Sequence, residues 1–424
     1  MRFGIHTLDD FDVAGKTVLL RADLNQPVDR KTGKLKSINR IAACVPTVKE
    51  LSEKGAKTVI LAHQGSDIEY QNYWTTAPHA EVLSELLGRP VQFLDDVCGP
   101  AAREKIAALQ PGEILLLDNV RFVAEEQTLF EKKLALTHEQ QAQTLLVRKL
   151  APLGDLFVCD AFAAAHRDQP SLCGFEQVLP CAMGRLFEKE YCVISGLMES
   201  PARPCIFILG GAKIADAFAM MKTVLDRKIA DRVLTGGLVA NIFLIAADKD
   251  VGSGSEAFIR KSGYWEFVAA AKALLAAYSE KIVLPSDLAF VQDGARVTAQ
   301  PGLCPSGGSA VDIGEETIEQ YVQLIRSAGT AFVNGPMGVF ENDVTAYGTK
   351  AVWEALALPE VYSVVGGGDS ITAAEKFGVK EKLSYVCTGG GALIRFLSGE
   401  ELPVVKALRE GAERTVPAWF EKEM

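Results

Sequence analysis

The stretch that decides the fold reads CIFILGGAK and runs from Cys205 to Lys213. Its first five residues form a continuous apolar run, which is typical of a central parallel strand covered on both faces. Gly210 and Gly211 then allow a tight turn and let a ligand approach the backbone closely. The stretch therefore predicts a strand, a glycine turn and a helix that begins near Lys213.

The same rhythm of apolar runs and helix-like segments continues along the chain. Further apolar runs occupy residues 17–20, 58–61, 114–117, 156–159, 232–234, 281–284, 330–333 and 362–365. Amphipathic, helix-like segments such as 41–54 and 139–150 lie between them. This alternation predicts an α/β fold with doubly wound, Rossmann-like parallel sheets.

The length of 424 residues exceeds what one hydrophobic core usually organises, so we expect two domains. Segments that contain Pro and Gly flank residues 186–198, which read as one helix. We predict a first domain over 1–185, an interdomain helix and hinge linker over 186–204, and a second domain over 205–404. Residues 405–424 are expected to return to the first domain.

Composition excludes several classes of protein. The net charge of −10 argues against a nucleic-acid binder that works through bulk charge, so an anionic ligand needs a local cluster of donors. No signal peptide and no run of about 20 apolar residues is present, which argues against a membrane protein. The nine cysteines form no C-x-x-C pair, which indicates reduced thiols and a cytoplasmic location. Nothing in the sequence points to an obligate protein partner.

Charged and polar residues follow the strands of the first half. Because ligands of doubly wound folds bind beyond the carboxyl ends of strands, we expect these residues to converge on one face. They are Asp23, Asn25, Arg40, His63, Arg121, His166 and Arg167. Arginine forks and protonated histidines suit a ligand that carries both phosphate and carboxylate. Each residue alone could be a surface ion pair or a cap, and the repetition after successive strands favours a site.

The second half collects glycines at the corresponding places. After Gly210-Gly211 come Gly236-Gly237, residues 334–341, Gly366-Gly367-Gly368-Asp369-Ser370, and residues 388–392. Glycines and helix N-termini let backbone N–H groups bind phosphate, although tight strand-to-helix turns use glycine too. The spacing matches neither a P-loop nor the G-x-G-x-x-G fingerprint.

Two side chains in this half have a chemical and a structural interpretation. Lys213 is a candidate for stabilising a phosphoryl group in transfer, or an ordinary lysine of a first helical turn, where it opposes the helix dipole. Asp369 is a candidate ligand of nucleotide-bound Mg²⁺, or a helix N-cap.

In order and spacing, these stretches resemble the phosphoglycerate kinase family in its archaeal-type form over essentially the whole chain. The matching stretches are residues 21–25, 119–122, 160–162, 165–167, 210–213, 334–341, 366–370 and 388–392. The resemblance implies an acceptor domain, then a nucleotide domain, and hinge closure between them. It also implies a reversible reaction, in which 1,3-bisphosphoglycerate and MgADP give 3-phosphoglycerate and MgATP.

The resemblance assigns roles to individual residues. It implies that the phosphoglycerate is held by Asp23, Asn25, Arg40, His63, Arg121 and Arg167. It implies that Lys213, Gly390 and Gly391, with Arg40, assist the transfer. The nucleotide would be bound by Lys213, Gly236, Gly237, Asn334, Glu341 (at the ribose), Gly366, Gly367, Gly368, Asp369 and Ser370. Asp369 would be the metal ligand for Mg²⁺.

Departures from the family pattern fall mostly on the acceptor half. The family usually has an arginine where this chain has Ser66, and an asparagine where it has Cys159. The acidic stretch from Asp67 to Glu69 follows, and Ala217 stands where many members have a second lysine. Three hypotheses are therefore open: a phosphoglycerate kinase, a paralogous acyl-phosphate kinase for another small carboxylate, and a catalytically weak nucleotide-binding regulator. The first is favoured.

Overall fold

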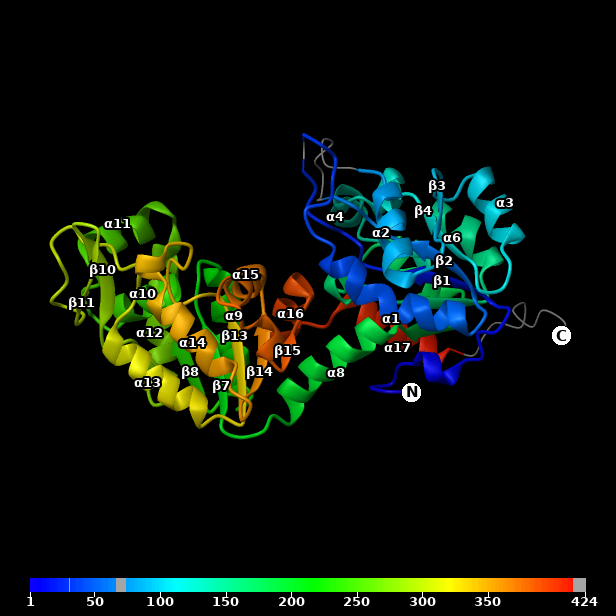
Figure 1. The fold of residues 1–424 in the computed structure, drawn as a ribbon. Coiled ribbons are helices and arrows are strands. Elements are labelled where there is room, and N and C mark those ends of the chain that lie inside the picture. The colour runs from blue at the N-terminus through cyan, green and yellow to red at the C-terminus, as the bar shows by residue number, and fades with distance from the viewer. Residues whose placement is uncertain (30, 66–73, 415–424) are drawn as a thin grey trace. The chain divides into compact units, whose positions relative to one another are not determined.

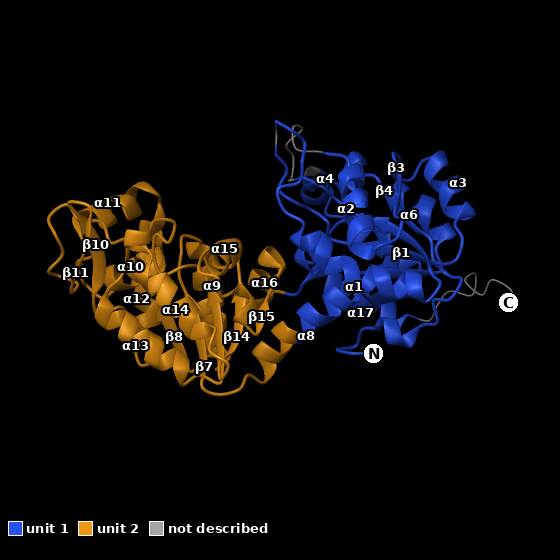
Figure 2. Ribbon diagram, in the orientation of Figure 1, with its two compact units in different colours: residues 1–192, 401–424 blue, residues 193–400 orange. Residues whose placement is uncertain are grey.

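The structure is a computed structural model that describes residues 1–29, 31–65 and 74–414. It contains two compact units, one of Met1–Cys192 with Glu401–Met424 and one of Val193–Glu400 (Figure 2). The division falls inside helix α8 (Arg185–Glu199) and not beside it. Ser66 and the acidic stretch after it lie outside the described residues.

Unit 1 is built on a six-stranded sheet of order β3-β4-β2-β1-β5-β6, in which all neighbouring strands are parallel. The strands are β1 (Thr17–Arg21), β2 (Lys57–Leu61), β3 (Gln92–Leu94), β4 (Ile114–Leu117), β5 (Leu156–Cys159) and β6 (Cys181–Met183). Central strands β1 and β5 are buried at every residue, as expected for a sheet covered on both faces. Every strand ends at the same edge, where the polar segments begin.

Helices cover both faces of this sheet. They are α1 (Asn39–Glu53), α2 (Ala77–Leu87), α3 (Pro100–Ala108), α4 (Thr128–Leu134), α5 (His138–Gln141), α6 (Leu145–Leu150), α7 (Pro170–Cys173) and α17 (Pro403–Glu413). Helices α1 and α2 share a core with alternate strand residues such as Leu20 and Ile60. On the other face Phe157 of β5 stacks on Phe175 at 5.1 Å between ring centroids. Helix α17, red in Figure 1, packs on β6 and α7 although it lies at the far end of the sequence.

One predicted helix-like segment is divided in the structure. Residues 139–150 form two short helices, α5 and α6, separated by residues 142–144. Helix α5 ends at Gln141, and Thr144 is the N-cap of α6: its hydroxyl donates to the carbonyl of Gln141 at 2.6 Å, and its backbone is extended. The prediction of one continuous segment was wrong because a threonine competed for the helix carbonyls.

Unit 2 contains a second six-stranded parallel sheet, of order β15-β14-β13-β7-β8-β9. Its strands are β7 (Cys205–Leu209), β8 (Arg232–Thr235), β9 (Ile282–Val283), β13 (Thr330–Asn334), β14 (Tyr362–Gly366) and β15 (Tyr385–Val386). Its helices are α9 (Ile214–Asp226), α10 (Gly237–Ala246), α11 (Ser253–Lys261), α12 (Phe267–Tyr278), α13 (Glu315–Arg326), α14 (Tyr347–Leu356), α15 (Gly368–Lys376) and α16 (Gly390–Leu397). Residues 205–213, the apolar run and glycine turn discussed above, thus form the central strand β7 and the turn into α9.

A small antiparallel sheet, absent from the sequence predictions, is added to unit 2. Its order is β11-β10-β12, from Ala295–Ala299, Leu288–Gln292 and Asp312–Ile313. The turn between β10 and β11 is Asp293-Gly294, and both residues have positive φ (50° and 78°). An Asp-Gly pair between two short runs is a hairpin signal, so the sequence contained the information. In the part of the chain that the structure describes, no helix has the length and apolar character needed to cross a membrane.

A charged cluster fixes the start of α8 against α1. Arg185 Nε and Nη2 donate to the two carboxylate oxygens of Glu50 at 2.7 and 2.8 Å, and Nη2 also donates to Asp9 at 2.5 Å. These hydrogen bonds lower the pKa of Glu50 from 4.5 to about 2, although burial opposes them. Because the folded pKa is depressed, this stabilisation is present above pH 4.5 and is lost as the pH falls towards 2.

We predict that Glu50→Gln lowers the free energy of unfolding by about 1–2 kcal/mol at pH 7, measured by urea denaturation. The difference from the wild-type protein should shrink as the pH is lowered from about 4.5 to 2. Glu53→Gln is the matched control on the same helix, because its side chain is 56% exposed and lies 3.9 Å from Lys49. Equal losses for both variants, or a loss at Glu50 that does not vary with pH, would contradict the prediction.

Candidate active site

The polar residues predicted for unit 1 lie at the edge of the sheet where the strands end. Strands β4, β2, β1 and β5 are successive neighbours, so the segments after them are adjacent. The residues on these segments and on the first turn of α1 are Arg121 (after β4), His63 (after β2), Asp23 and Asn25 (after β1), Arg167 (after β5) and Arg40 (on α1).

Asp23 orients Arg40 and the loop that follows β1. Its side chain is almost fully buried, and Oδ2 accepts a hydrogen bond from Arg40 Nη1 at 2.8 Å. Oδ1 accepts from the backbone N–H of Asn25 at 3.2 Å, and Asn25 Oδ1 accepts from the N–H of Gly65 at 3.0 Å. The side chain of Arg40 stays 40% exposed. This ion pair uses one of the five N–H donors of Arg40, and the guanidinium group still faces solvent.

Arg21 and His63 form a buried pair at the ends of β1 and β2. Arg21 Nη2 lies 3.1 Å from His63 Nδ1, and Arg21 Nε donates to Ser171 Oγ at 2.9 Å. Since a guanidinium can only donate, Nδ1 is the acceptor and the ring proton is on Nε2. Arg21 was not among the predicted site residues, because an arginine inside an apolar strand gives no periodic signal.

The pKa of His63 is lowered by its burial and by the arginines around it. Burial, and then the charges of Arg121, Arg21, Arg40 and Arg167, hold this pKa well below its usual range. His63 is therefore a neutral donor, and the expectation of a protonated histidine was wrong. The four guanidinium groups supply the positive charge that the sequence analysis partly assigned to the imidazole.

Arg121 and Arg167 are each held by a partner within the unit. Arg121 is buried; its Nη1 donates to the carbonyl of Gly65. Arg167 Nη1 donates to Thr128 Oγ1 at 3.1 Å and lies 3.7 Å from Glu131 Oε2. Fixed guanidinium groups of this kind bind carboxylates and phosphates without a large loss of side-chain entropy.

Buried amide groups fix the turn that carries His63. Asn119 Oδ1 accepts from the N–H of Gln64 at 3.2 Å, and Asn119 Nδ2 donates to the carbonyls of Gln64 and Trp74 at 2.7 and 3.0 Å. The Gln64 side chain bonds both the N–H and the carbonyl of Gln26, at 2.9 and 2.8 Å. This network, which the sequence analysis did not foresee, connects the loops after β1, β2 and β4.

The glycine segments of unit 2 gather at the corresponding edge of its sheet and interlock there. A β-carbon at Gly210 would overlap the carbonyl oxygen of Pro336, and one at Gly335 would overlap that of Gly210. Gly335 also has φ +88°, which favours glycine. A β-carbon at Gly236 would overlap the side chain and Cα of Met337. These glycines therefore have a structural role, because they let the loops after β7, β8 and β13 cross.

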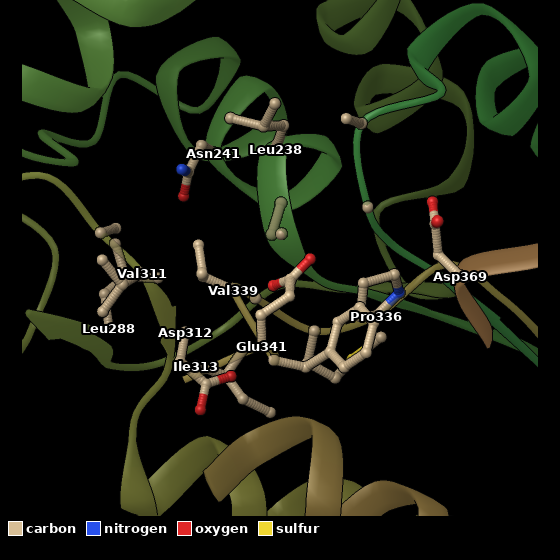
Figure 3. Close-up of a pocket in the computed structure, with 18 residues that line it drawn as sticks. Leu238, Asn241, Leu288, Val311, Asp312, Ile313, Pro336, Val339, Glu341 and Asp369 are labelled. Carbon is tan, nitrogen blue, oxygen red and sulfur yellow. The ribbon is translucent and has the colours of Figure 1, made fainter. Parts of the chain in front are cut away.

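A cavity of about 450 Å³ lies beside these loops (Figure 3). This volume falls within the range of about 300–1,000 Å³ for small-molecule sites. Apolar walls come from residues such as Leu288, Val311 and Val339, and polar groups from Asn241, Glu341 and Asp369. Figure 3 shows Asn241 and Asp369 on different sides of the cavity. Asn241, on α10, was not predicted and carried no motif signal.

A narrow cleft adjoins the cavity and shares Gly211, Ala212 and Asp369 with it. Its lining includes the predicted residues Lys213, Asn334, Gly367, Gly368, Asp369 and Ser370. Lys213 is exposed at the N-cap position of α9, and its side chain makes no capping bond. Asp369 is in the first turn of α15, whose N-cap is Gly367, so the N-cap interpretation of Asp369 was wrong.

Of the predicted nucleotide residues, Gly237 and Glu341 line only the larger cavity. Gly236, Gly366, Gly390 and Gly391 line neither space. Gly366 has a packing role instead, because a β-carbon there would overlap the side chain of Leu393. Gly390 and Gly391 are the first two residues of α16.

Two adjacent glycines of the cleft should respond differently to the same substitution. Gly367 has φ +88° and a β-carbon there would overlap Asn334 Oδ1, whereas no atom of the described residues lies within 4 Å of a β-carbon at Gly368. In urea denaturation, Gly367→Ala should lower the free energy of unfolding by about 1–3 kcal/mol. The free energy of unfolding of Gly368→Ala should stay within about 0.5 kcal/mol of the wild-type value. Similar losses for both variants would contradict this prediction.

Comparisons with known proteins give a consistent result. The family model described as phosphoglycerate kinase matches residues 8–400. A curated phosphoglycerate kinase from Methanothermobacter thermautotrophicus is 45% identical over 408 residues, which are 96% of this chain and 97% of that protein. One from Methanobacterium bryantii is 44% identical, with 97% of this chain and 98% of that protein covered.

Solved structures agree with the sequence comparisons. The crystal structure of phosphoglycerate kinase from Pyrococcus horikoshii matches with a TM-score of 0.86 and 41% identity, and covers 97% of this chain and 100% of that one. The structure of phosphoglycerate kinase from Coxiella burnetii matches with a TM-score of 0.81 and 30% identity, over 96% and 100% of the two chains.

Proposed function

Because the chain belongs to the phosphoglycerate kinase family, and is thus a phosphotransferase with a carboxyl group as acceptor, we propose how its residues carry out the family's reaction. That reaction is the reversible conversion of 1,3-bisphosphoglycerate and ADP to 3-phosphoglycerate and ATP. The observation that carries the assignment of the acceptor half is the set of four arginines around the neutral His63. In a chain of net charge −10, this is a local site for a strongly anionic ligand.

On the acceptor side, Arg40, Arg121 and Arg167 bind the phosphate and carboxylate, and His63 donates from Nε2. Asp23 acts through Arg40, because its two oxygens bond Arg40 and the loop N–H. Asn25 likewise holds the turn at Gly65. Arg21 is a further positioning residue, since it fixes the tautomer of His63.

On the nucleotide side, the cavity takes the nucleoside and the adjoining cleft takes the phosphates. Glu341 faces the ribose, and Gly236, Gly237 and Asn334 shape the loops that border the base. Gly366 ends β14, and Gly367, Gly368 and Ser370 form the start of α15, whose N–H groups attract phosphate. Gly390 and Gly391 do the same at the start of α16.

Asp369 fits the Mg²⁺ that accompanies the nucleotide. Its carboxylate is exposed and borders both the cavity and the cleft, and Mg²⁺ prefers oxygen ligands. The ion supplies charge neutralisation to the nucleotide phosphates when it is bound. Lys213, at the mouth of the same cleft, interacts with the phosphoryl group as it moves.

The chemistry requires positioning and charge neutralisation rather than a base. In the direction that consumes ATP, the attacking group is the ionised carboxylate of 3-phosphoglycerate; in the opposite direction it is a phosphate oxygen of ADP, and neither needs a proton removed. Because the acceptor and nucleotide residues belong to different units, transfer requires the two ligands to meet, and we propose hinge closure for this step. We further propose that the reaction takes place in the cytoplasm and needs no protein partner.

A coupled assay with purified protein, MgATP and 3-phosphoglycerate tests the acceptor. We expect robust turnover of 3-phosphoglycerate and none of a panel of other small carboxylates. Turnover of another acid alone would favour the paralogous kinase. Nucleotide binding without any turnover would favour the regulator, and either result would overturn the proposal.

Replacement of Lys213 tests its role in transfer. Lys213→Met should lower kcat at least about 100-fold with a small change in KM, because a charge that acts in the transition state is removed. Lys222→Met is the matched control on the same helix, where an exposed lysine pairs with Asp226. We expect the control to keep full activity. A Lys213 variant that loses affinity but keeps kcat would show instead that this lysine only binds the ground state.

A further inference from the structure

Three side chains outside the proposed active site gather their ligand atoms in one place. His138, Asp168 and Cys173 each offer one atom, and these atoms all lie within 4.8 Å of one another. His138 begins α5, Asp168 precedes α7, and Cys173 ends α7. Cys173 is fully buried and His138 nearly so. Nitrogen, oxygen and sulfur ligands from separate segments thus converge in a mostly buried position.

A second carboxylate fixes the orientation of the imidazole ring. His138 Nδ1 lies 2.8 Å from Glu410 Oε2, on α17, and Gln177 Nε2 donates to the same oxygen at 3.2 Å. The opposite ring nitrogen, Nε2, therefore faces Asp168 Oδ1 at 3.6 Å. A carboxylate on one nitrogen of a histidine, with the other nitrogen turned to further ligands, is the usual outer shell of a zinc site.

We propose that His138 Nε2, Asp168 Oδ1 and Cys173 Sγ form a binding site for a thiophilic divalent cation, for which Zn²⁺ is the probe. Tetrahedral zinc with bonds of about 2.0–2.3 Å places its ligand atoms about 3.4–3.7 Å apart. The nitrogen and oxygen already have this spacing, at 3.6 Å. The sulfur lies within 4.8 Å of the other two atoms and has to approach by about 1.3 Å at most, and a fourth position stays open for water.

The exchange of protons for the cation is balanced in charge. In the absence of a cation, a carboxylate oxygen faces each ring nitrogen of His138, Glu410 Oε2 at 2.8 Å from Nδ1 and Asp168 Oδ1 at 3.6 Å from Nε2, so the ring carries a proton on both nitrogens. Cys173 Sγ donates to the carbonyl oxygen of Arg167 at 3.7 Å, which requires the thiol form. Binding of M²⁺ releases the Nε2 proton of His138 and the thiol proton of Cys173 to solvent. Two protons leave as two positive charges enter, so the buried site acquires no net charge.

The site adjoins the segment that carries Arg167. The N–H of Asp168 donates to Glu131 Oε1 at 2.9 Å, and Glu131 Oε2 lies 3.7 Å from Arg167 Nη1. Cys173 Sγ also lies 3.7 Å from the carbonyl oxygen of Arg167. A cation held by Asp168 and Cys173 therefore restrains residues 167–173, independently of what Arg167 binds.

Titration of the metal-free protein with Zn²⁺, in competition with a fluorescent chelator, tests the site. We expect one equivalent to bind with micromolar affinity or tighter. Co²⁺ as a second probe should give a thiolate charge-transfer absorption band. Cys173→Ser should weaken Zn²⁺ binding at least about tenfold and abolish the band, because serine is not a soft ligand.

Cys181→Ser is the matched control. Cys181 is also a buried thiol directed at a backbone carbonyl, that of Leu408 at 3.8 Å, but it lies outside the cluster. The Cys181→Ser protein should bind Zn²⁺ with the same affinity as the wild-type protein. If Cys173→Ser fails to fold, Glu410→Gln gives a second test, with an expected loss of about 10–100-fold.

Amide hydrogen exchange provides a readout that does not depend on catalysis. Exchange of residues 167–173 should slow when the wild-type protein binds Zn²⁺, and should not change in Cys173→Ser. Absence of stoichiometric binding, or binding that both variants retain unchanged, would overturn the proposal. The latter result would assign the cation to other thiols such as Cys98, Cys192 or Cys304, which are partly exposed.

Discussion

The crossing of backbone loops at Gly210 and Gly335 is the constraint on which unit 2 depends. A β-carbon at Gly210 would overlap the carbonyl oxygen of Pro336, a β-carbon at Gly335 would overlap that of Gly210, and the N–H of Gly211 donates to the carbonyl of Pro336 at 2.8 Å. Without this approach the loops after β7 and β13 could not both lie beside the cavity. Several glycines that resemble phosphate-binding residues in the sequence thus have a packing role, and only some, such as Gly368, are free of one.

Unit 1 gathers positive charge at the carboxyl edge of its sheet, so the guanidinium groups have to be held by residues of the unit itself. Each guanidinium has a local partner: Asp23 for Arg40, Glu131 for Arg167, the carbonyl of Gly65 for Arg121, and Ser171 for Arg21. The partners lie within the unit, so the cluster can persist before an anion arrives. His63 takes no part in this balance, since burial and the surrounding arginines keep it neutral. The guanidinium groups are therefore held in place within the unit, which suits the anion site that we propose.

The sequence predicted the parts of this molecule that arise from local pattern. Buried parallel strands give continuous apolar runs, and every predicted run coincides with a strand, lies within one or contains one. Residues after strands could be placed on one edge because parallel topology does so automatically. Arg21, Gln64 and Asn241 were missed because their roles depend on side-chain partners distant in sequence. The hairpin at Asp293-Gly294 was missed although its turn residues signal it, and the 139–150 segment was divided by a single threonine hydroxyl.

The same edge of unit 1 also fixes the start of the helix that runs between the units. Asp160 follows β5 directly and is fully buried, and its Oδ1 accepts from the N–H groups of Leu186 and Phe187 at 2.9 and 3.1 Å. Gly184 permits this, because a β-carbon there would overlap the carboxyl group. Burial raises the pKa of Asp160 to about 7, while the helix N–H groups favour the charged form. The loop that leads from Asp160 to Arg167 and the first turn of α8 therefore cannot move apart without breaking two hydrogen bonds to one buried carboxylate.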